Sequence, residues 1–265
     1  MTVLFERPAV DAVEARRLVG TVPWFHRVEP IEGLITPGWV GGDSYDAAGY
    51  VDSFGLGDVK GLKILEIGTW DGPLAYELAL RGAQVTASDI QDPSKTGFNV
   101  LGKIGGLSVP YQRASVYDLG GLFPEQFDVV LFLGVFYHLK YPVLAFESIA
   151  KSLKQGGKLI AEGGGMPVTF DNVQGKPVEV GPELVAALDA LDALGVPVRL
   201  TYPGTYIGGD NWHLPNRSAL HGWMEGAGFE VQGEAWQNSV AQGRRVGATG
   251  IKAREPNQEH VIIGD

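Results

Sequence analysis

The chain has 265 residues, and 45% of them are hydrophobic, which supplies a sizeable core and favours one main domain with insertions. Its formal net charge of −10 provides no overall field that would draw it to nucleic acid or to anionic membranes. The absence of cysteine excludes thiol nucleophiles, disulfides and thiolate metal sites, and without a signal peptide or a membrane-length apolar stretch we expect a cytoplasmic protein.

The first sixty residues predict a helix followed by an aromatic arm. Residues 10–19 carry apolar side chains at helical spacing, and the pattern ends near Gly20. Aromatic residues and a histidine then alternate with turn-forming residues over 23–39, without the period of a helix or a strand. We interpret residues 1–60 as an arm that either packs on the main domain or covers a bound ligand as a lid.

Residues 63–82 predict a strand that leads into a helix through a glycine turn. The apolar run that ends at Ile67 is too short for a helix, and the turn Gly68-Thr-Trp-Asp-Gly72 follows it directly. Glycine lets a ligand approach the backbone, and the N–H groups at a helix start favour polar or anionic groups. Trp70 stands where dinucleotide-binding turns carry a second glycine, so we do not expect NAD as the cofactor.

Alternating strands and helices follow the same scheme further along the chain. Strands are predicted at 63–67, 84–88, 109–113, 128–133 and 158–162, and helices at 73–80, 95–103 and 142–154. The segment Gln155-Gly-Gly157 is typical of a helix C-cap. This alternation indicates an α/β fold with a Rossmann-like, doubly wound, mostly parallel sheet.

The last third of the chain predicts an insertion before the fold resumes. Residues 166–210 lack a clear period apart from an amphipathic helix at 182–194. Asn216 is a good cap for a late helix, and residues 228–231 and 245–252 suit a closing antiparallel pair. We therefore expect seven strands with the last one antiparallel, a main domain over residues 61–255, and a tail over 256–265.

Three acids follow successive strand ends, and their order points to a cofactor. Glu66 precedes the glycine turn, Asp89 ends the second strand where an acid accepts hydrogen bonds from ribose hydroxyls, and Asp118 follows the third. In this arrangement the chain resembles the class I S-adenosylmethionine-dependent methyltransferases. The alternative is a generic Rossmann-like domain whose acids only cap helices.

Four further pieces of the chain resemble one branch of these enzymes, the tRNA wobble-uridine 5-oxyacetate methyl and carboxymethyl transferases and their relatives. The pieces are Trp24-Phe-His-Arg27 with Thr36-Pro-Gly38, Ile67-Gly-Thr-Trp-Asp-Gly72, Gly134-Val-Phe-Tyr-His-Leu139 and Asn211-Trp-His-Leu-Pro215. The resemblance implies S-adenosyl-L-methionine, or its carboxylated form, as donor and S-adenosyl-L-homocysteine as product. It also matches Tyr137 to a donor-site tyrosine, and Arg244 or Arg245 to a terminal arginine.

The resemblance assigns the donor site to residues at the ends of the predicted strands. These residues are Glu66, Gly68, Thr69, Trp70, Gly72, Asp89, Ile90, Tyr117, Asp118 and Gly134.

Methyl transfer is an in-line displacement, so catalytic groups align the acceptor and, for a protic acceptor, take its proton. His138, with Tyr137, follows the fourth strand on the side where ligands bind in open α/β sheets, and it is a candidate base or a group that only orients the loop. His213 is the second candidate, with packing against Trp212 as the alternative. Glu162 ends strand five, and no histidine pair has metal-ligand spacing, so we expect no catalytic metal.

Three functions remain open from the sequence. We expect a methyltransferase that acts on oxygen or nitrogen of a small molecule of specialised metabolism, enclosed by the insertion and the arm. A tRNA wobble-uridine methyl or carboxymethyl transferase is the first alternative, although this chain is acidic and lacks a long basic extension. A non-catalytic S-adenosylmethionine-binding protein is the second. The sequence gives no oligomeric state and no membrane partner.

Overall fold

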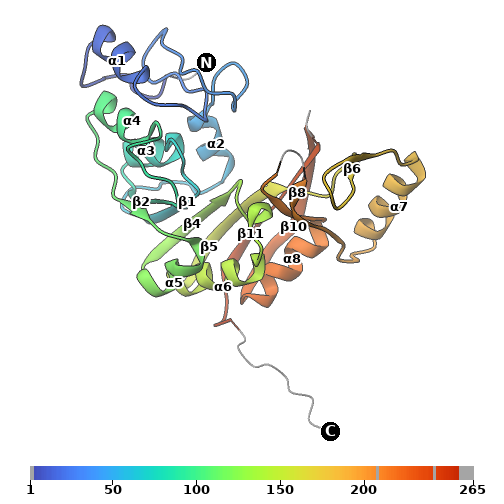
Figure 1. Cartoon of the computed structure of the whole chain (residues 1–265). Helices are drawn as coiled ribbons and strands as arrows, with labels where there is room; N and C mark the ends of the chain where they lie inside the picture. Colours follow the sequence, from blue (N-terminus) through green and yellow to red (C-terminus); the bar gives the residue numbers. More distant parts are fainter. Residues whose placement is uncertain (1–2, 207–208, 241–242, 257–265) are drawn as a thin grey trace. The chain divides into compact units, whose positions relative to one another are not determined.

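The computed structural model describes residues 3–206, 209–240 and 243–256 (Figure 1). The chain divides into two compact units, residues 1–115 and residues 116–265, which we call the first and second unit. Each is described by itself below.

The first unit is built on three parallel strands. These strands are β1 (Lys63–Ile67), β2 (Gln84–Asp89) and β3 (Tyr111–Arg113), with β2 paired to both others. Helix α3 (Pro73–Leu80) connects β1 to β2, and α4 (Phe98–Gly105) precedes β3. Ile64 and Leu65 of β1 are fully buried, which explains why so short a run is rich in apolar side chains.

The N-terminal arm surrounds this small sheet with two short helices and a folded loop. Helix α1 (Ala12–Val19) confirms the predicted helix, and Asp11 caps it by accepting the Glu14 N–H. Helix α2 (Ala47–Ser53) was not predicted, because its seven residues hold few apolar positions. Between them the chain makes isolated bridges, His26 with Val40 and Ile31 with Leu34, instead of long strands.

The second unit carries four strands of the Rossmann-like fold. Strand β4 (Phe127–Leu133) runs parallel to β5 (Leu153–Gly164), and β11 (Gly243–Lys252) runs antiparallel to both β5 and β10 (Phe229–Val240). The helical segments are η1 (Val116–Asp118), α5 (Leu119–Leu122), η2 (Phe136–His138), α6 (Pro142–Ser152) and α8 (Arg217–Gly226). Asn216 caps α8 as predicted, by accepting the Ala219 N–H.

The insertion consists of two hairpins and a helix, of which the sequence indicated only the helix. The elements are β6 (Phe170–Asp171), β7 (Pro177–Val178), α7 (Pro182–Ala193), β8 (Arg199–Tyr206) and β9 (Asn211–Pro215). Tyr202, Tyr206 and Leu214 form a small core within it. The apolar stripe of α7 stays largely at the surface, with Leu184 and Leu191 exposed, so its amphipathic pattern predicted the helix but not its packing.

The predicted fold class is confirmed, since the sheet strands are mostly parallel and the closing pair is antiparallel. The predicted connection between the helix at 142–154 and the strand at 158–162 was wrong. Helix α6 ends at Ser152 rather than at residue 154, and β5 begins at once with Leu153. The segment Gln155-Gly-Gly157 therefore lies in β5 and does not cap the helix. Within the described ranges, the helices are too short or too polar to cross a bilayer.

Candidate functional site

The turn between β1 and α3 has an unusual backbone at three positions. Gly68, Trp70 and Gly72 all have positive φ, at 79°, 47° and 80°. Trp70 is not a glycine, so its left-handed conformation is strained, which is a feature of functional turns. A Cβ on Gly72 would lie 2.5 Å from the ring of Phe98, so both backbone angle and packing require glycine there.

The buried side chain of Glu66 lies at the start of α3. Its carboxyl group accepts a hydrogen bond of 2.6 Å from the Thr69 hydroxyl and another from the Ala75 N–H. Burial raises the pKa of Glu66 to about 8, and the nearby charge of Asp89 acts in the same direction. Because a protein acid already occupies this helix start, the turn does not form a phosphate cradle.

Asp89 joins the turn to the end of β2. One carboxylate oxygen accepts the Trp70 N–H and the other accepts the Gln91 N–H, each at 3.0 Å. A carboxylate has about four acceptor positions, so each oxygen keeps one for a ligand hydroxyl. The next residue, Ile90, is 64% exposed and offers an apolar surface beside this acid. Together they suit a vicinal diol attached to a planar ring.

Asp71 lies at the centre of the same turn, and the sequence analysis did not single it out. It is fully buried, and its carboxylate accepts the N–H groups of Phe25 and His26, at 2.9 and 2.7 Å, and of Gly97, at 2.8 Å. The His26 Nδ1 lies 3.2 Å from the same carboxylate. This acid therefore fixes the N-terminal arm onto the turn. An acid enclosed between Trp70 and a glycine was the available signal.

Aromatic contacts reinforce the join between arm and turn. The ring of Phe25 lies 5.0 Å from that of Trp70 and 4.8 Å from that of Trp39, measured between centroids. The arm thus packs on the turn, as one of the two interpretations of its aromatic residues expected. Trp39 is nevertheless 70% exposed, so the cluster also presents an aromatic ring to solvent.

Three predicted donor-site residues lie in the second unit. Gly134 follows β4 with a φ of 72°, and its N–H donates to the carbonyl of Glu162 at 2.8 Å. Tyr117 accepts the Tyr141 N–H on its hydroxyl at 3.2 Å. Asp118 ends η1 with an exposed side chain that makes no capping hydrogen bond to α5.

Tyr137 and His138 form a cluster with an ion pair that the sequence only hinted at. The guanidinium of Arg245 binds the carboxylate of Glu162 through two hydrogen bonds, and its Nη1 lies 3.5 Å from the Tyr137 hydroxyl. The cation also lies 5.4 Å from the centre of the Tyr137 ring. Burial opposes this charge, but the Glu162 hydrogen bonds prevail and raise the pKa of Arg245. These contacts hold the Tyr137 side chain in place beside His138.

The ring of His138 lies against that of Tyr137 at a tilt of 41°, with centroids 4.0 Å apart, and its Nδ1 lies 3.0 Å from the Asp210 carbonyl. A carbonyl only accepts, so Nδ1 carries the proton and Nε2 has the free electron pair of a base. Loss of water around the ring lowers the pKa of His138, and the charge of Arg245 acts in the same direction, although part of the side chain is exposed.

The hydrogen-bond partners of His213 lie outside this cluster. Its Nδ1 is 3.2 Å from the Thr201 hydroxyl and its Nε2 is 3.1 Å from the Lys140 carbonyl, so both nitrogens have partners. The side chain is buried and packs edge-on against Trp223, not against Trp212 as the sequence suggested.

The glycines after Glu162 have a packing role. Gly163 and Gly164 belong to β5, and Cβ atoms there would lie 2.6 Å from the Phe136 ring and 3.3 Å from the Tyr137 ring. They leave room for η2 to lie against the strand.

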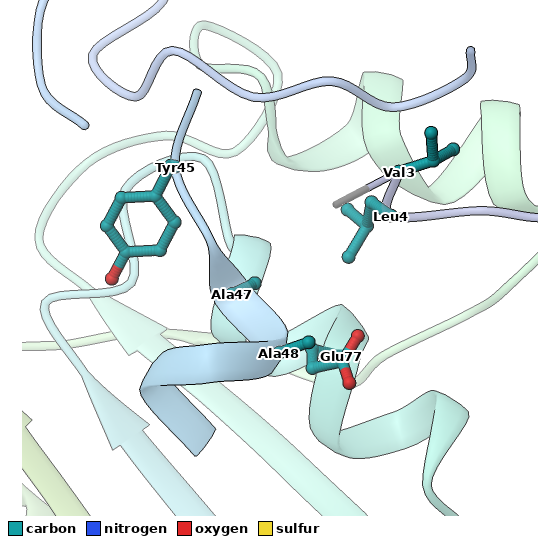
Figure 2. Close-up of a pocket in the computed structure, with 6 residues that line it drawn as sticks. All are labelled: Val3, Leu4, Tyr45, Ala47, Ala48 and Glu77. Carbon is teal, nitrogen blue, oxygen red and sulfur yellow. The ribbon is translucent and has the colours of Figure 1, made fainter. Parts of the chain in front are cut away.

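The described residues form no metal site, and a hollow among them is too small for a ligand. No three His, Asp or Glu side chains gather there in a way that would hold a metal ion. A hollow in the first unit is lined by Val3, Leu4, Tyr45, Ala47, Ala48 and Glu77 (Figure 2). Its volume of about 10 Å³ is at most that of a water molecule, and none of the predicted site residues line it.

Comparison with known proteins identifies the fold that carries this site. Residues 65–161, which include the turn, Asp89, Gly134, Tyr137 and His138, match the family model of the methyltransferase domain. The chain contains a class I methyltransferase domain.

Curated relatives of this methyltransferase domain act in different settings. A ubiquinone biosynthesis O-methyltransferase of Pseudomonas syringae pv. tomato is 32% identical over 102 residues, 38% of this chain and 44% of the relative. A tRNA U34 carboxymethyltransferase of Desulfotalea psychrophila is 30% identical over 176 residues, 66% of this chain and 47% of the relative. The chain therefore spans less than half the length of these curated relatives.

A solved structure extends the likeness beyond the central domain. The N-terminal domain of EvdMO1 with SAH bound has a TM-score of 0.61 and 20% identity, over 95% of this chain and all of that one. At this identity the comparison shows the fold alone. The aligned part of this chain includes the arm and the insertion.

The buried acid of the turn yields a stability prediction. Because the pKa of Glu66 is about 8 in the folded protein and 4.5 in a free side chain, the folded state keeps a proton that the unfolded state loses between these values. Stability should therefore fall as pH rises through this window. As pH rises from 5 to 8, we expect the free energy of unfolding of Glu66→Gln to increase relative to that of the parent protein, by roughly 1 kcal/mol or more.

Urea unfolding at pH 5, 6.5 and 8 measures this difference. Glu230→Gln, at an exposed position on β10, is the matched control and should follow the parent protein at each pH. A constant difference between Glu66→Gln and the parent would show that Glu66 is already ionised in the fold at pH 5.

Proposed function

We propose that this protein transfers the methyl group of S-adenosyl-L-methionine to an oxygen or nitrogen atom of a small molecule and releases S-adenosyl-L-homocysteine. The observation that carries the proposal is Asp89, held by the Trp70 N–H within the matched methyltransferase domain and with acceptor positions to spare. Solved relatives of the same fold were crystallised with SAH, which supports this donor.

The first unit supplies most of the donor contacts in this proposal. Asp89 binds the two ribose hydroxyls, and the exposed side chain of Ile90 packs on the adenine ring. The glycine turn lets the methionine part approach the backbone. Glu66 and Thr69 act indirectly, since they bond to each other and keep the turn in shape. The donor residues proposed in the second unit are Tyr117, Asp118 and Gly134.

The second unit serves the acceptor. Tyr137 and His138 present a hydroxyl and a free Nε2 from η2, supported by the Arg245–Glu162 pair. We assign His138 either as the base or as the group that orients a protic acceptor. We assign His213 a structural role, because both of its nitrogens are engaged.

The ion pair of Arg245 also favours the ordinary donor over a carboxylated one. A carboxylated donor needs a cation for its extra carboxylate, and Arg245, one of the two residues matched to the family's terminal arginine, is bound on two nitrogens by Glu162. Breaking this ion pair would leave the half-buried Glu162 carboxylate without its partner, which would cost free energy.

A small acceptor agrees with the charge of the chain. The net charge of the chain is −10, so the molecule as a whole does not attract a polyanion. The relative named for ubiquinone biosynthesis acts on a small molecule. The tRNA carboxymethyltransferase relative, which matches two thirds of this chain, supports tRNA as the second candidate acceptor.

One experiment separates these functions. The protein is incubated with methyl-labelled S-adenosylmethionine and, in parallel, with a metabolite extract, with a panel of phenols, anilines and aliphatic alcohols, and with unmodified tRNA. Label in small molecules supports the proposal. Label in tRNA, together with tRNA retention that weakens steeply with salt, would instead support the second candidate.

The donor site gives a direct binding prediction. Asp89→Ala removes a charged acceptor for two ribose hydroxyls, so we expect S-adenosylhomocysteine binding to weaken by about 1 to 3 kcal/mol. Isothermal titration calorimetry measures this change. Asp58→Ala, at an exposed acid in the same unit, is the control and should bind as the parent does. Unchanged affinity in Asp89→Ala would remove Asp89 from the donor site.

The catalytic cluster gives a prediction that separates binding from turnover. His138→Ala should keep donor affinity within about twofold while turnover falls roughly 10²-fold, because a positioned polar group near the reacting atoms is lost. His221→Ala, on the surface of α8, is the matched control. If Tyr137→Phe shows the larger loss, the key contact belongs to the tyrosine. Full turnover in His138→Ala would end its assignment.

A further inference from the structure

The pair formed by His26 and Asp71 has the arrangement of a general base and its orienting acid. Asp71 accepts three backbone N–H groups, so its oxygens act as acceptors and the group is a carboxylate. The His26 Nδ1, 3.2 Å from one of these oxygens, must then carry the proton. When the ring is neutral, Nε2 therefore keeps its electron pair, and no group of the described residues bonds to it.

The imidazole is held in place by its surroundings. The rings of Phe25 and Tyr45 lie edge-on to it, each at 4.9 Å between centroids. Its side chain is 13% exposed, so it is enclosed yet reached by solvent. The charged group that bonds to it is Asp71, and the Tyr45 ring is the other titratable neighbour that contacts it.

Two motifs of the arm serve this histidine. The hydroxyl of Thr36 donates to the His26 carbonyl and accepts the Val28 N–H, both at 2.8 Å. A Cβ on Gly38 would lie 2.1 Å from the same carbonyl, so only glycine fits there. The segments 24–27 and 36–38, which the proposed methyl transfer leaves without a role, thus combine to fix His26.

The pair lies within the donor turn. Asp71 directly follows Trp70, whose N–H binds the donor-site acid Asp89. The rings of Trp70 and Phe25 are in contact, and Phe25 precedes His26. All of these residues belong to the first unit.

We propose that His26, oriented by Asp71, is the general base of the reaction and that the acceptor is a hydroxyl group. This inference rests on the proposed methyl transfer. The acceptor oxygen forms a bond to the methyl carbon, the carbon–sulfur bond breaks with its electron pair going to sulfur, and the acceptor proton passes to the His26 Nε2 and then to water. Asp71 is a positioning residue that stabilises the resulting imidazolium.

The choice of a hydroxyl follows from what a base contributes. An alcohol or phenol is a weak nucleophile until its proton leaves, whereas a neutral amine attacks with a free electron pair and needs no base beforehand. A histidine held in the base tautomer beside the donor turn therefore serves an O–H acceptor.

Variants of the histidines test this assignment with the phenol and aniline panel and labelled donor. His26→Gln should lower turnover of the phenols roughly 10²-fold or more, with S-adenosylhomocysteine affinity within about twofold. The fall in turnover at acid pH, present in the parent protein, should disappear in His26→Gln and persist in His138→Ala. Imidazole in the buffer should restore part of the turnover of His26→Ala, and His221→Gln is the surface control.

The contrary results are equally specific. Full turnover in His26→Gln, loss of the acid limb only in His138→Ala, or methylation of anilines but of no phenol would each overturn the assignment. Failure of the parent protein to bind S-adenosylhomocysteine would instead overturn the methyl transfer itself, so the two failures are distinguishable.

A second measurement needs no acceptor. Nitrogen-15 NMR of histidine-labelled protein, with His26 identified by the signal lost in His26→Gln, reports which ring nitrogen is protonated. We expect the Nδ1–H tautomer in the parent protein, because the Asp71 oxygen that faces Nδ1 can only accept. The Nε2–H tautomer in the parent protein would overturn the assignment.

Discussion

The carboxylate of Asp71 is the interaction on which the first unit depends. A fully buried charge costs several kcal/mol unless hydrogen bonds satisfy it, and here three backbone amides from two separate segments do so. Because these amides belong to the arm and to the start of α4, the acid joins both to the glycine turn. The turn therefore keeps a strained Trp70 that its own sequence would not hold.

The second unit fixes a short segment with an ion pair. Glu162 at the end of β5 and Arg245 on β11 form a pair across neighbouring antiparallel strands, and Tyr137 packs against the cation. Glycines 163 and 164 make this possible, since side chains there would collide with η2. In the first unit a buried carboxylate, and in the second an ion pair, fixes a short segment after a strand end, where ligands bind in this class of fold.

Much of the fold was readable from the sequence because the strands are short apolar runs that end at glycine or an acid. Asp89 was predictable for the same reason, since an acid at a strand end has a known use. Asp71 was not, because two of its three amide partners lie some 45 residues earlier in an arm without any period, and the third is Gly97. The hairpins of the insertion were missed because β8 and β9 bury only one small core. The exposed apolar stripe of α7 shows that an amphipathic pattern predicts a helix but not the surface on which it packs.

The most direct test of this account is hydrogen exchange at the three amides that donate to Asp71, those of Phe25, His26 and Gly97, measured residue by residue with NMR. If the acid joins the arm to the turn, all three exchange slowly and at similar rates, and S-adenosylhomocysteine slows them together. Fast exchange of Phe25 and His26 while Gly97 stays protected would contradict it, because the arm would then open independently of the donor turn.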